Sequence, residues 1–355
     1  MTTTHSIRLT TRDGVEVRFD CAEDEAVTAA AARSGLILPT LCGSGGCGTC
    51  RAACSEGAVE LGPHSATALP ADAAARGEVL LCRTFPRSDL VLSAPFDRAH
   101  ILSGDLPERG ATVTGLERVA VNTVRLTLLL DPHEELGSGA DFEPGQYMEL
   151  AVPGTDIRRA YSIASAPNWD GTMEFLIRLQ PGGRFSGWLA GAGVGARLTA
   201  FGPAGHFTLQ ERGLTPRWFL AGGTGLAPML SMLRRMAEWG EVQEARLFFG
   251  VNRDEELFAE AELSALAAAL PVLTVMRCVR QPAQGWNGFT GTPVDALDHA
   301  LWENGGTAPD LYVCGPPAMV EAVRATAARH GLPDGQVLCE AFLPSGVGEN
   351  VPAGG

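Results

Sequence analysis

Nine consecutive residues carry most of the information in this sequence: Cys42-Gly43-Ser44-Gly45-Gly46-Cys47-Gly48-Thr49-Cys50. With a distant fourth cysteine, Cys82, they give a C-x4-C-x2-C spacing that is typical of the ligands of a [2Fe–2S] cluster. Four thiolates must reach two irons, so three would come from one tight loop and the fourth from another segment. We therefore predict that Cys42, Cys47, Cys50 and Cys82 bind a [2Fe–2S] cluster.

The glycines of this loop support the prediction, although other interpretations of the cysteines stay open. Gly43, Gly45, Gly46 and Gly48 allow positive φ and bring backbone N–H groups close to the sulfurs. A zinc site usually pairs two C-x2-C units, and this loop has only one; a glycine-rich surface loop without a ligand is a further alternative. Disulfides fit less well, because nine cysteines is an odd number and we see no signal peptide.

The overall composition limits the classes of function. At 355 residues the chain is long enough for two or three domains, and 45% hydrophobic residues can form buried cores. The net charge of −14 argues against nucleic acid as a partner and allows acidic faces for docking another protein. No window approaches about 18 uninterrupted apolar residues, so we expect no membrane segment. Unpaired cysteines fit a reducing compartment, and we expect a cytoplasmic protein.

The pattern of apolar residues predicts three domains of different class: α+β at 1–99, all-β at 106–211 and α/β at 212–343, followed by a tail at 344–355. The first should contain a hairpin at 6–19, a helix at 26–33 and strands at 59–61, 79–82 and 90–92. The second should contain strands at 112–119 and 123–130, a turn within 141–150 that leads into another strand, a strand segment at 158–165 and a strand at 173–179. Short strands at this spacing predict an antiparallel barrel.

Two segments of the predicted barrel have side chains that suit a flavin nucleotide. In one strand, Arg159 offers donors to a phosphate and Tyr161 offers a ring for stacking, while Ser162 points to the opposite face. After the next strand, a glycine turn leads into a helix with Ser186 in its first turn, and the N–H groups there can seat an anion. Each segment alone also fits a solvated strand or an ordinary serine-capped turn. Together they predict a bound flavin.

In the last domain strands and helices alternate, which predicts a parallel sheet. The predicted strands are 217–221, 245–251, 272–279, 310–314 and 336–340, and the predicted helices are 228–239, 260–270, 294–301 and 317–330. The first strand leads into the glycine-rich turn 222–225, which suits a pyrophosphate although it is not G-x-G-x-x-G, and Pro228 is expected at the first helical position. The fourth strand ends at Cys314, where a ligand of an open α/β sheet binds; a small residue in a tight turn is the plainer interpretation.

Acidic residues after the second strand of this sheet favour NADH over NADPH. The segment reads Asn252-Arg253-Asp254-Glu255-Glu256. An acidic side chain there can bind the ribose hydroxyls of NADH, whereas Arg253 could hold the 2′-phosphate of NADPH. Because the carboxylates outnumber the arginine, we predict NADH.

The order of the three domains resembles the NADH-dependent ferredoxin-type reductases of bacterial oxygenases, above all the reductase components of soluble methane, propane and alkene monooxygenases. The resemblance covers nearly the whole chain. It is carried by Ala68-Leu69-Pro70, Gly77-Glu78-Val79-Leu80-Leu81-Cys82-Arg83-Thr84-Phe85-Pro86-Arg87-Ser88-Asp89-Leu90, Leu311-Tyr312-Val313-Cys314-Gly315-Pro316-Pro317 and Glu340-Ala341-Phe342-Leu343. It implies a β-grasp [2Fe–2S] domain, a six-stranded FAD barrel and an NAD domain.

The resemblance also implies roles for individual residues. The cofactor-binding residues are then Arg159, Tyr161, Ser162, Gly183, Phe185, Ser186 and Phe342 for FAD, and Gly223, Thr224, Gly225, Cys314, Gly315 and Pro316 for NADH. Ser162, Cys314, Glu340 and Phe342 are expected to take part in catalysis, with Ser162 near flavin N5. The implied reaction takes hydride from NADH to FAD and passes single electrons through the cluster to a diiron hydroxylase, which docks transiently on the cluster domain. We expect a monomer.

Other functions remain as alternatives. Reductases of Rieske aromatic dioxygenases and of phenol or toluene monooxygenases share the same order of domains. A stand-alone flavin reductase would not need the cluster domain, and an iron–sulfur redox sensor without turnover would not need both nucleotide sites. One departure from the family pattern is the Gly/Pro-rich tail at 344–355, which follows Phe342 where the relatives end and which we expect to be disordered.

Overall fold

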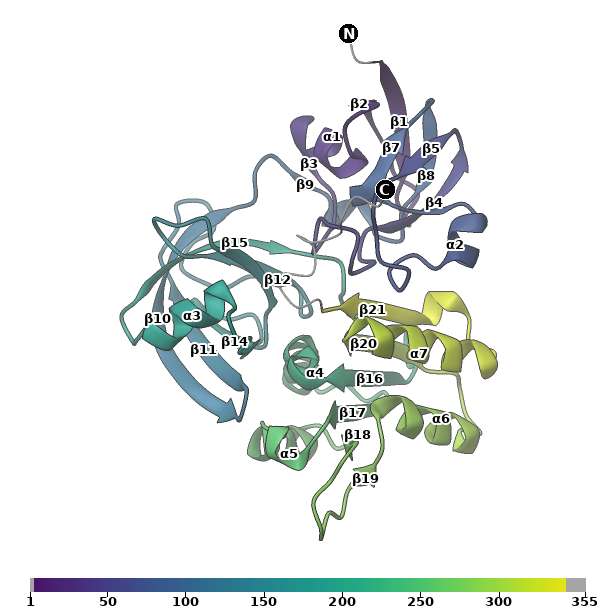
Figure 1. Cartoon of the computed structure of the whole chain (residues 1–355). Helices are drawn as coiled ribbons and strands as arrows, with labels where there is room; N and C mark the ends of the chain where they lie inside the picture. The colour runs from purple at the N-terminus through teal and green to yellow at the C-terminus, as the bar shows by residue number, and fades with distance from the viewer. Residues whose placement is uncertain (1–2, 343–355) are drawn as a thin grey trace. The chain divides into compact units, whose positions relative to one another are not determined.

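A computed structural model of the chain describes residues 3–342 (Figure 1), so the predicted tail at 344–355 lies outside the described residues. The structure has two compact units. The first comprises residues up to Pro107 together with the short segment Pro203–His206, and the second comprises Glu108–Gly202 and Phe207–Phe342. Between residues 3 and 342, no helix is both long enough and apolar enough to cross a membrane.

The first unit is an α+β fold around a five-stranded sheet of order β2-β1-β8-β4-β6. Its strands are β1 (Thr4–Thr10), β2 (Glu16–Ala22), β4 (Arg51–Glu56), β6 (Glu78–Leu80) and β8 (Leu90–Ser93), with two small pairs, β3 (Leu36–Ile37) with β9 (Leu102–Ser103) and β5 (Val59–Leu61) with β7 (Thr84–Pro86). Its helical segments are α1 (Val27–Arg33), α2 (Ala71–Ala75), η1 (Leu81–Arg83) and η2 (Arg98–His100). Alternation along β1 buries Ile7 and Leu9 completely. The cysteine loop fills the connection between β3 and β4.

The second unit begins with a six-stranded antiparallel barrel of order β13-β12-β15-β10-β11-β14. Its strands are β10 (Glu108–Ala120), β11 (Thr123–Leu130), β12 (Tyr147–Ala151), β13 (Arg158–Ser162), β14 (Thr172–Arg178) and β15 (Arg197–Ala204), and α3 (Arg184–Gly191) follows β14. A bridge between Ile163 and Phe175 joins the two outer strands and closes the barrel. Alternation along β11 buries Leu126, Leu128 and Leu130 in the interior.

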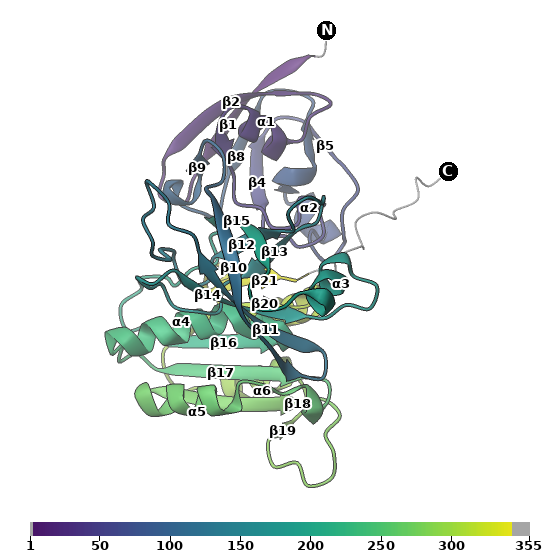
Figure 2. The ribbon, with the colours of Figure 1, turned by 90° about the vertical axis from the view of Figure 1, so that its left-hand side faces the viewer.

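The rest of the second unit is a parallel sheet of order β19-β18-β17-β16-β20-β21 (Figure 2). Its strands are β16 (Arg217–Gly222), β17 (Ala245–Val251), β18 (Leu273–Val279), β19 (Phe289–Thr290), β20 (Asp310–Gly315) and β21 (Val337–Ala341). The helices α4 (Leu226–Trp239) and α5 (Glu260–Ala269) share one core with the sheet, while α6 (Pro293–Glu303) and α7 (Pro317–Arg329) share another. Short 3-10 turns are η3 (Gly223–Gly225), η4 (Asp254–Glu256) and η5 (Asp334–Gln336). The chain order reverses between β16 and β20, where ligands of such sheets bind.

Four charged side chains connect the barrel to the helices of this sheet. Arg234 on α4 lies 2.7 Å from a carboxylate oxygen of Glu174 on β14 and also pairs with Glu262 on α5. Arg125 on β11 reaches the same Glu262 at 2.6 Å. Arg234 further donates to the carbonyl oxygen of Ala164 at 3.0 Å. These contacts hold the chain just beyond Ser162 against α4.

The three predicted classes of domain are confirmed, but the sequence prediction missed several elements. Strand β15 was not predicted, because its buried positions include the small residues Ala200, Gly202 and Ala204, which have low strand propensity. Strand β4 was also missed. Helix α4 starts at Leu226, directly after η3, so the prediction that Pro228 is its first residue was wrong. Pro228 is tolerated as the third residue because N–H groups in the first turn have no partner within the helix.

Candidate functional site

The four predicted cluster ligands meet in the first unit as unpaired cysteines. The sulfurs of Cys50 and Cys82 lie 3.2 Å apart, beyond the S–S distance of about 2 Å in a disulfide. Cys42 lies close enough to Cys47 and Cys82 for both to lower its pKa. Cys42 thus contacts Cys47 and Cys82, and Cys82 contacts Cys50, so the four sulfurs form one connected group, as the ligands of a [2Fe–2S] cluster must.

The backbone of the loop turns toward these sulfurs as the glycines suggested. The N–H groups of Ser44 and Gly46 lie 3.5 Å and 3.4 Å from Cys42 Sγ. Gly43, Gly45 and Gly48 have positive φ, whereas Gly46 does not, which corrects that part of the prediction. A Cβ at Gly45 would stand 2.7 Å from the Arg83 side chain, so the loop needs glycine there.

The contacts among the four thiols shift their pKa values in different directions. Contact with Cys47 lowers the pKa of Cys42, and contact with Cys82 lowers that of Cys50. The pKa values of Cys47 and Cys82 are raised, chiefly by Cys42.

A second group of predicted residues meets in the second unit. Ser162, the last residue of β13, donates from Oγ to Glu340 Oε2 at 2.8 Å, and both side chains are buried. Burial raises the pKa of Glu340 to about 7, against the lowering effect of the Ser162 hydrogen bond. Cys314 lies beside Glu340 in the register of β20 with β21 and is completely buried, which raises the pKa of its thiol. Phe342 follows β21, and its N–H donates to the Gly315 carbonyl at 2.8 Å.

The glycine turn after β16 packs directly against the end of β20. A Cβ at Gly225 would overlap the carbonyl oxygen of Cys314, and a Cβ at Gly222 would stand 3.0 Å from Pro316 and Met319. Gly223 has φ +55° and open space around it. The structure thus brings Gly223, Thr224 and Gly225 beside the Cys314–Pro316 segment at the reversal in strand order, where a pyrophosphate can approach the backbone.

Replacing Gly225 with alanine should disturb this turn, because the new methyl group would overlap the Cys314 carbonyl oxygen. We expect a loss of about 1–3 kcal/mol of unfolding free energy, typical of overpacking, together with weaker NADH binding. Thermal unfolding and a titration with NADH measure the two effects. Gly193→Ala is the control, since nothing lies within 4 Å of its added Cβ; equal behaviour of the two variants would contradict the packing argument.

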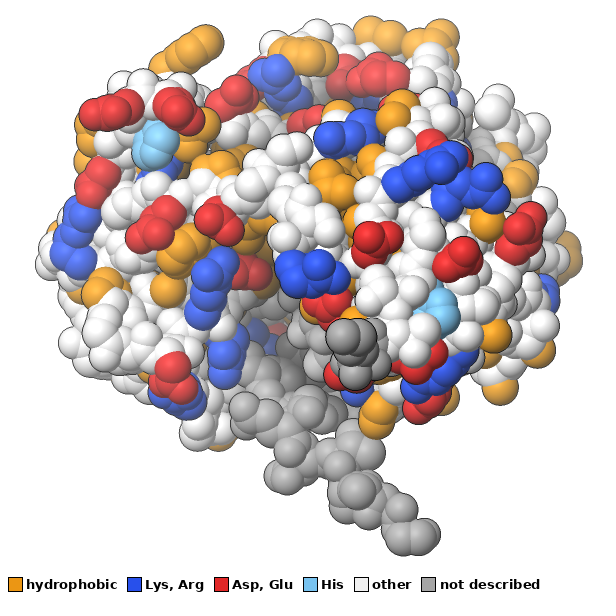
Figure 3. Space-filling model, turned by 90° about the horizontal axis from the view of Figure 1, so that it is seen from above, with side chains coloured by type: hydrophobic (Ala, Val, Ile, Leu, Met, Phe, Trp, Pro, Cys, Tyr) orange, Lys and Arg blue, Asp and Glu red, His pale blue; other side chains and the backbone are white. Residues whose placement is uncertain are grey.

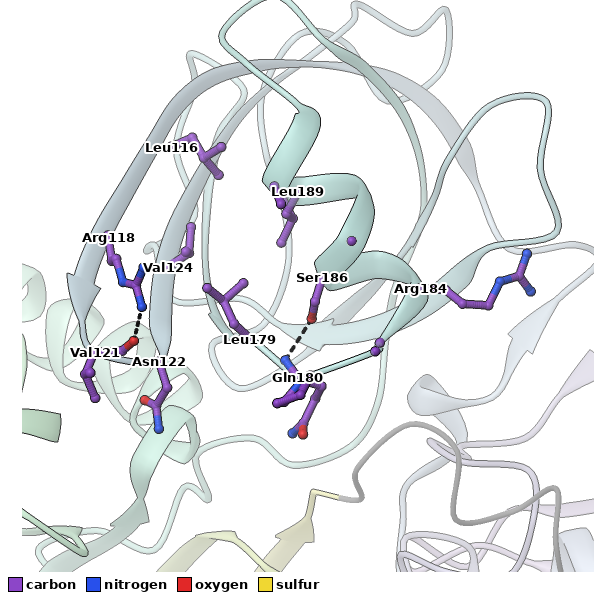
Figure 4. Close-up of a pocket in the computed structure, with 15 residues that line it drawn as sticks. Leu116, Arg118, Val121, Asn122, Val124, Leu179, Gln180, Arg184, Ser186 and Leu189 are labelled. Carbon is purple, nitrogen blue, oxygen red and sulfur yellow. Dashed lines mark hydrogen bonds between the residues drawn. The ribbon is translucent and has the colours of Figure 1, made fainter.

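The predicted flavin segments contribute to one cavity and to one aromatic cluster on the barrel. A cavity of about 690 Å³ is lined by Gly182, Gly183, Arg184, Ser186 and the β10–β11 hairpin (Figure 4). Helix α3 begins at this cavity without a side-chain cap, so its first N–H groups can face an anion.

Polar groups around this cavity are arranged by local hydrogen bonds. Ser186 Oγ accepts from the N–H of Gln180 at 2.9 Å, which holds the glycine turn closed (Figure 4). The Arg184 side chain points away from the cavity and pairs with Asp156 at 2.9 Å.

The strand residues predicted for the flavin lie outside the lining of this cavity. Arg159 donates to the carbonyl oxygen of Arg158 at 2.8 Å. Tyr161 packs on Phe185 with ring centroids 5.0 Å apart, and burial raises its pKa. Phe185 therefore connects the strand β13 to the start of α3, the two segments that we predict for one flavin.

The segment that should select NADH is held by local contacts. Glu256 accepts the N–H of Asn252 at 3.1 Å, and Asp254 accepts that of Ala283 at 3.2 Å. Arg253 lies 3.6 Å from Glu255, and both are largely exposed.

Sequence reasoning missed residues that act through distant contacts. The Arg234 network and the bond from His206 Nε2 to the Thr49 carbonyl at 3.1 Å join segments far apart in the chain. Arg234 lies in an amphipathic helix, and His206 follows the unpredicted strand β15. Neither residue is part of a local motif that could have revealed its role.

Three domain families match the chain. An iron–sulfur 2Fe–2S cluster binding domain matches residues 10–87, an oxidoreductase FAD-binding domain matches 110–209 and an oxidoreductase NAD-binding domain matches 219–325. The cofactors of the chain are therefore a [2Fe–2S] cluster, FAD and NAD. The cysteine loop, the start of α3 and the turn at η3 lie within the three matches in that order.

Proteins of known role resemble the chain along almost all of its length. The 2-halobenzoate 1,2-dioxygenase electron transfer component of Burkholderia cepacia is 38% identical, with 96% of this chain and 98% of the relative covered. The methane monooxygenase component C of Methylosinus trichosporium is 39% identical, with 82% and 86% covered. Among solved structures, a cytochrome P450 reductase of Amycolatopsis has a TM-score of 0.70 at 30% identity, with 95% and 99% covered.

Proposed function

The chain belongs to the family of three-domain iron–sulfur flavoprotein reductases that includes oxygenase electron transfer components, and from this premise we propose that it passes electrons from NADH to the terminal component of a multicomponent oxygenase. It is an oxidoreductase with all three redox domains on one chain. The observation that supports the proposal is the presence of NAD, FAD and [2Fe–2S] domains on one chain. This combination suits electron transfer from a two-electron donor to a one-electron acceptor.

The residues of the chain fit the groups that they would hold. When bound, NADH supplies electrons as hydride, FAD accepts them in pairs and releases them singly, and the cluster carries one at a time. Cys42, Cys47, Cys50 and Cys82 hold the cluster. The start of α3 and the η3 turn hold the phosphates of the two nucleotides.

Ser162 and Glu340 form a buried hydrogen-bonded pair in the second unit that can hold a proton. Ser162 Oγ donates to Glu340 Oε2 at 2.8 Å in a site closed to water. The hydroxyl has a single hydrogen, so Ser162 can donate to a flavin edge only when the protonated Glu340 carboxyl donates to Ser162 Oγ instead. The Glu340 pKa of about 7 makes both protonation states accessible near neutral pH. The buried Cys314 lies beside Glu340 in the register of β20 with β21.

We propose a diiron hydroxylase as the electron acceptor, on the family resemblance of the segment around Cys82 and the 39% identity to a methane monooxygenase component. A terminal dioxygenase is a second candidate, favoured by the 38% identity to a dioxygenase electron transfer component over nearly the whole chain. Arginine and acidic side chains are intermixed on the face that Figure 3 shows. Docking on a surface of this kind should depend on a pattern of charges rather than on one sign.

Reconstitution tests the acceptor directly. The purified chain and NADH are mixed with a diiron hydroxylase in one reaction and with a terminal dioxygenase in another. Product formation is measured in each reaction. Turnover with the hydroxylase alone supports the proposal, whereas turnover only with the dioxygenase replaces it with the second candidate. Failure with both, in a preparation that reduces cytochrome c normally, would contradict an oxygenase partner of either kind.

A further inference from the structure

A short segment from the middle of the sequence folds with the cysteine domain. Residues Pro203–His206 belong to the first unit, although they continue from strand β15 of the barrel. The next residue, Phe207, is buried in the core of the second unit. His206 is therefore the last residue of this segment of the first unit, and Phe207 belongs to the second unit.

His206 uses this position to reach the cysteine loop. Its Nε2 lies 3.1 Å from the backbone carbonyl oxygen of Thr49. A carbonyl oxygen can only accept, so Nε2 must carry the hydrogen and donate. The ring also packs on Phe96, with ring centroids 5.4 Å apart. This enclosure lowers the pKa of His206 to about 4, so the ring is neutral at pH 7 with its hydrogen on Nε2.

The Thr49 carbonyl lies in the Cys47–Cys50 arc, the backbone segment between these two predicted cluster ligands. On either side of it the carbonyls have backbone partners, since Gly48 O accepts from Arg51 N–H at 3.1 Å and Cys50 O accepts from Leu81 N–H at 3.0 Å. The carbonyl between them is satisfied by an imidazole instead. Thr49 is only 6% exposed, so loss of this bond would strand a buried polar group.

We propose that His206 is a positioning residue for the iron–sulfur cluster. It fixes the Thr49 peptide and thereby the orientation of the Cys47–Cys50 arc, so the environment of the cluster depends on a residue that follows the flavin barrel in sequence. This inference rests on the proposed cluster site and adds to it a contact that no cysteine spacing can reveal. Partners that orient metal ligands from outside commonly change affinity or activity by about 10–100-fold when lost.

Paired substitutions at His206 in the full chain test the role of the donor. His206→Gln keeps a side-chain N–H near the position of Nε2, whereas His206→Leu keeps bulk and removes the donor. His330→Gln is the matched control, since its Nε2 bonds Asp298 at 2.8 Å in the second unit. The readouts are iron and sulfide content, the EPR spectrum of the reduced cluster, and the rates of flavin and cluster bleaching after anaerobic mixing with NADH.

We expect His206→Leu to alter the EPR spectrum and to slow cluster bleaching about tenfold, the low end of the range for such partners. Flavin bleaching should keep its rate, and His206→Gln and His330→Gln should match the wild type. Wild-type spectra and rates in His206→Leu, or equal damage in His206→Gln, would overturn the proposal.

Two further outcomes are covered by the same design. If His206→Leu does not fold, His206→Asn replaces it, because the asparagine amide is too short to reach the Thr49 carbonyl. This variant should show the same defect in the cluster. A normal cluster in His206→Asn would overturn the proposal. A wild-type chain that holds no cluster after reconstitution would instead contradict the proposed function itself, so the two failures are distinct.

Discussion

Cys82→Ser is expected to remove the [2Fe–2S] cluster while NADH still bleaches the flavin. Cys82 is the ligand supplied from outside the loop, and its sulfur lies 3.2 Å from that of Cys50. Without it one iron keeps a single thiolate, and a serine hydroxyl is a far weaker ligand at neutral pH. Iron should fall from about two atoms per chain to near zero, and reduction of a one-electron acceptor should be lost with it.

Cys54→Ser provides the control for this result. Cys54 lies on β4 in the same unit, is half-buried and contacts the Glu56 carbonyl at 3.4 Å rather than any of the four sulfurs. Its iron content and visible spectrum should equal those of the wild type. A Cys82→Ser chain that keeps the full cluster would contradict the assignment of the fourth ligand.

Ser162→Ala is expected to slow the reduction of flavin by NADH at least about 100-fold, the scale of a lost group that positions or transfers a proton. The substitution removes the hydroxyl that Glu340 accepts and leaves a buried carboxyl without this partner. Stopped-flow mixing with NADH under anaerobic conditions measures the rate. Ser165→Ala is the control, because that buried hydroxyl accepts only the Glu174 N–H at 3.2 Å. Equal rates in both variants would remove Ser162 from the mechanism.

The same pair predicts how pH acts on stability. The pKa of Glu340 is raised from 4.5 to about 7 by burial, so folding favours the protonated carboxyl. Its stabilising contribution is fully present below about pH 4.5 and is lost as pH rises through about 7. Relative to Glu340→Gln, the wild type should therefore lose on the order of 2–3 kcal/mol of unfolding free energy between pH 4.5 and 8. Denaturant unfolding at several pH values measures this, and a constant difference would contradict a buried neutral carboxyl.

The local motifs could be predicted from the sequence because their chemistry lies in short segments. The spacing of Cys42, Cys47 and Cys50 is visible without any fold, and so is the glycine turn that ends at Gly225. The alternation of strands and helices after residue 216 likewise predicts the parallel sheet, since period and length suffice for that inference.

Contacts between distant segments could not be predicted in the same way. Ser162 and Glu340 are 178 positions apart, and their hydrogen bond depends on how β13 meets β21. The role of His206 depends on β15, a strand that could not be predicted because its small residues have low strand propensity. The Arg234 network joins four elements through side chains that would each pass for a solvated surface residue. Tertiary packing, rather than local propensity, decides all three.

The visible spectrum of the purified chain before and after anaerobic NADH, with NADPH as the comparison, tests the account most directly. We expect flavin and [2Fe–2S] absorption in the oxidised protein, and bleaching of both by NADH far more readily than by NADPH. A yellow protein without cluster absorption, even after anaerobic reconstitution with iron and sulfide, would contradict the four-cysteine site and leave a plain flavin reductase.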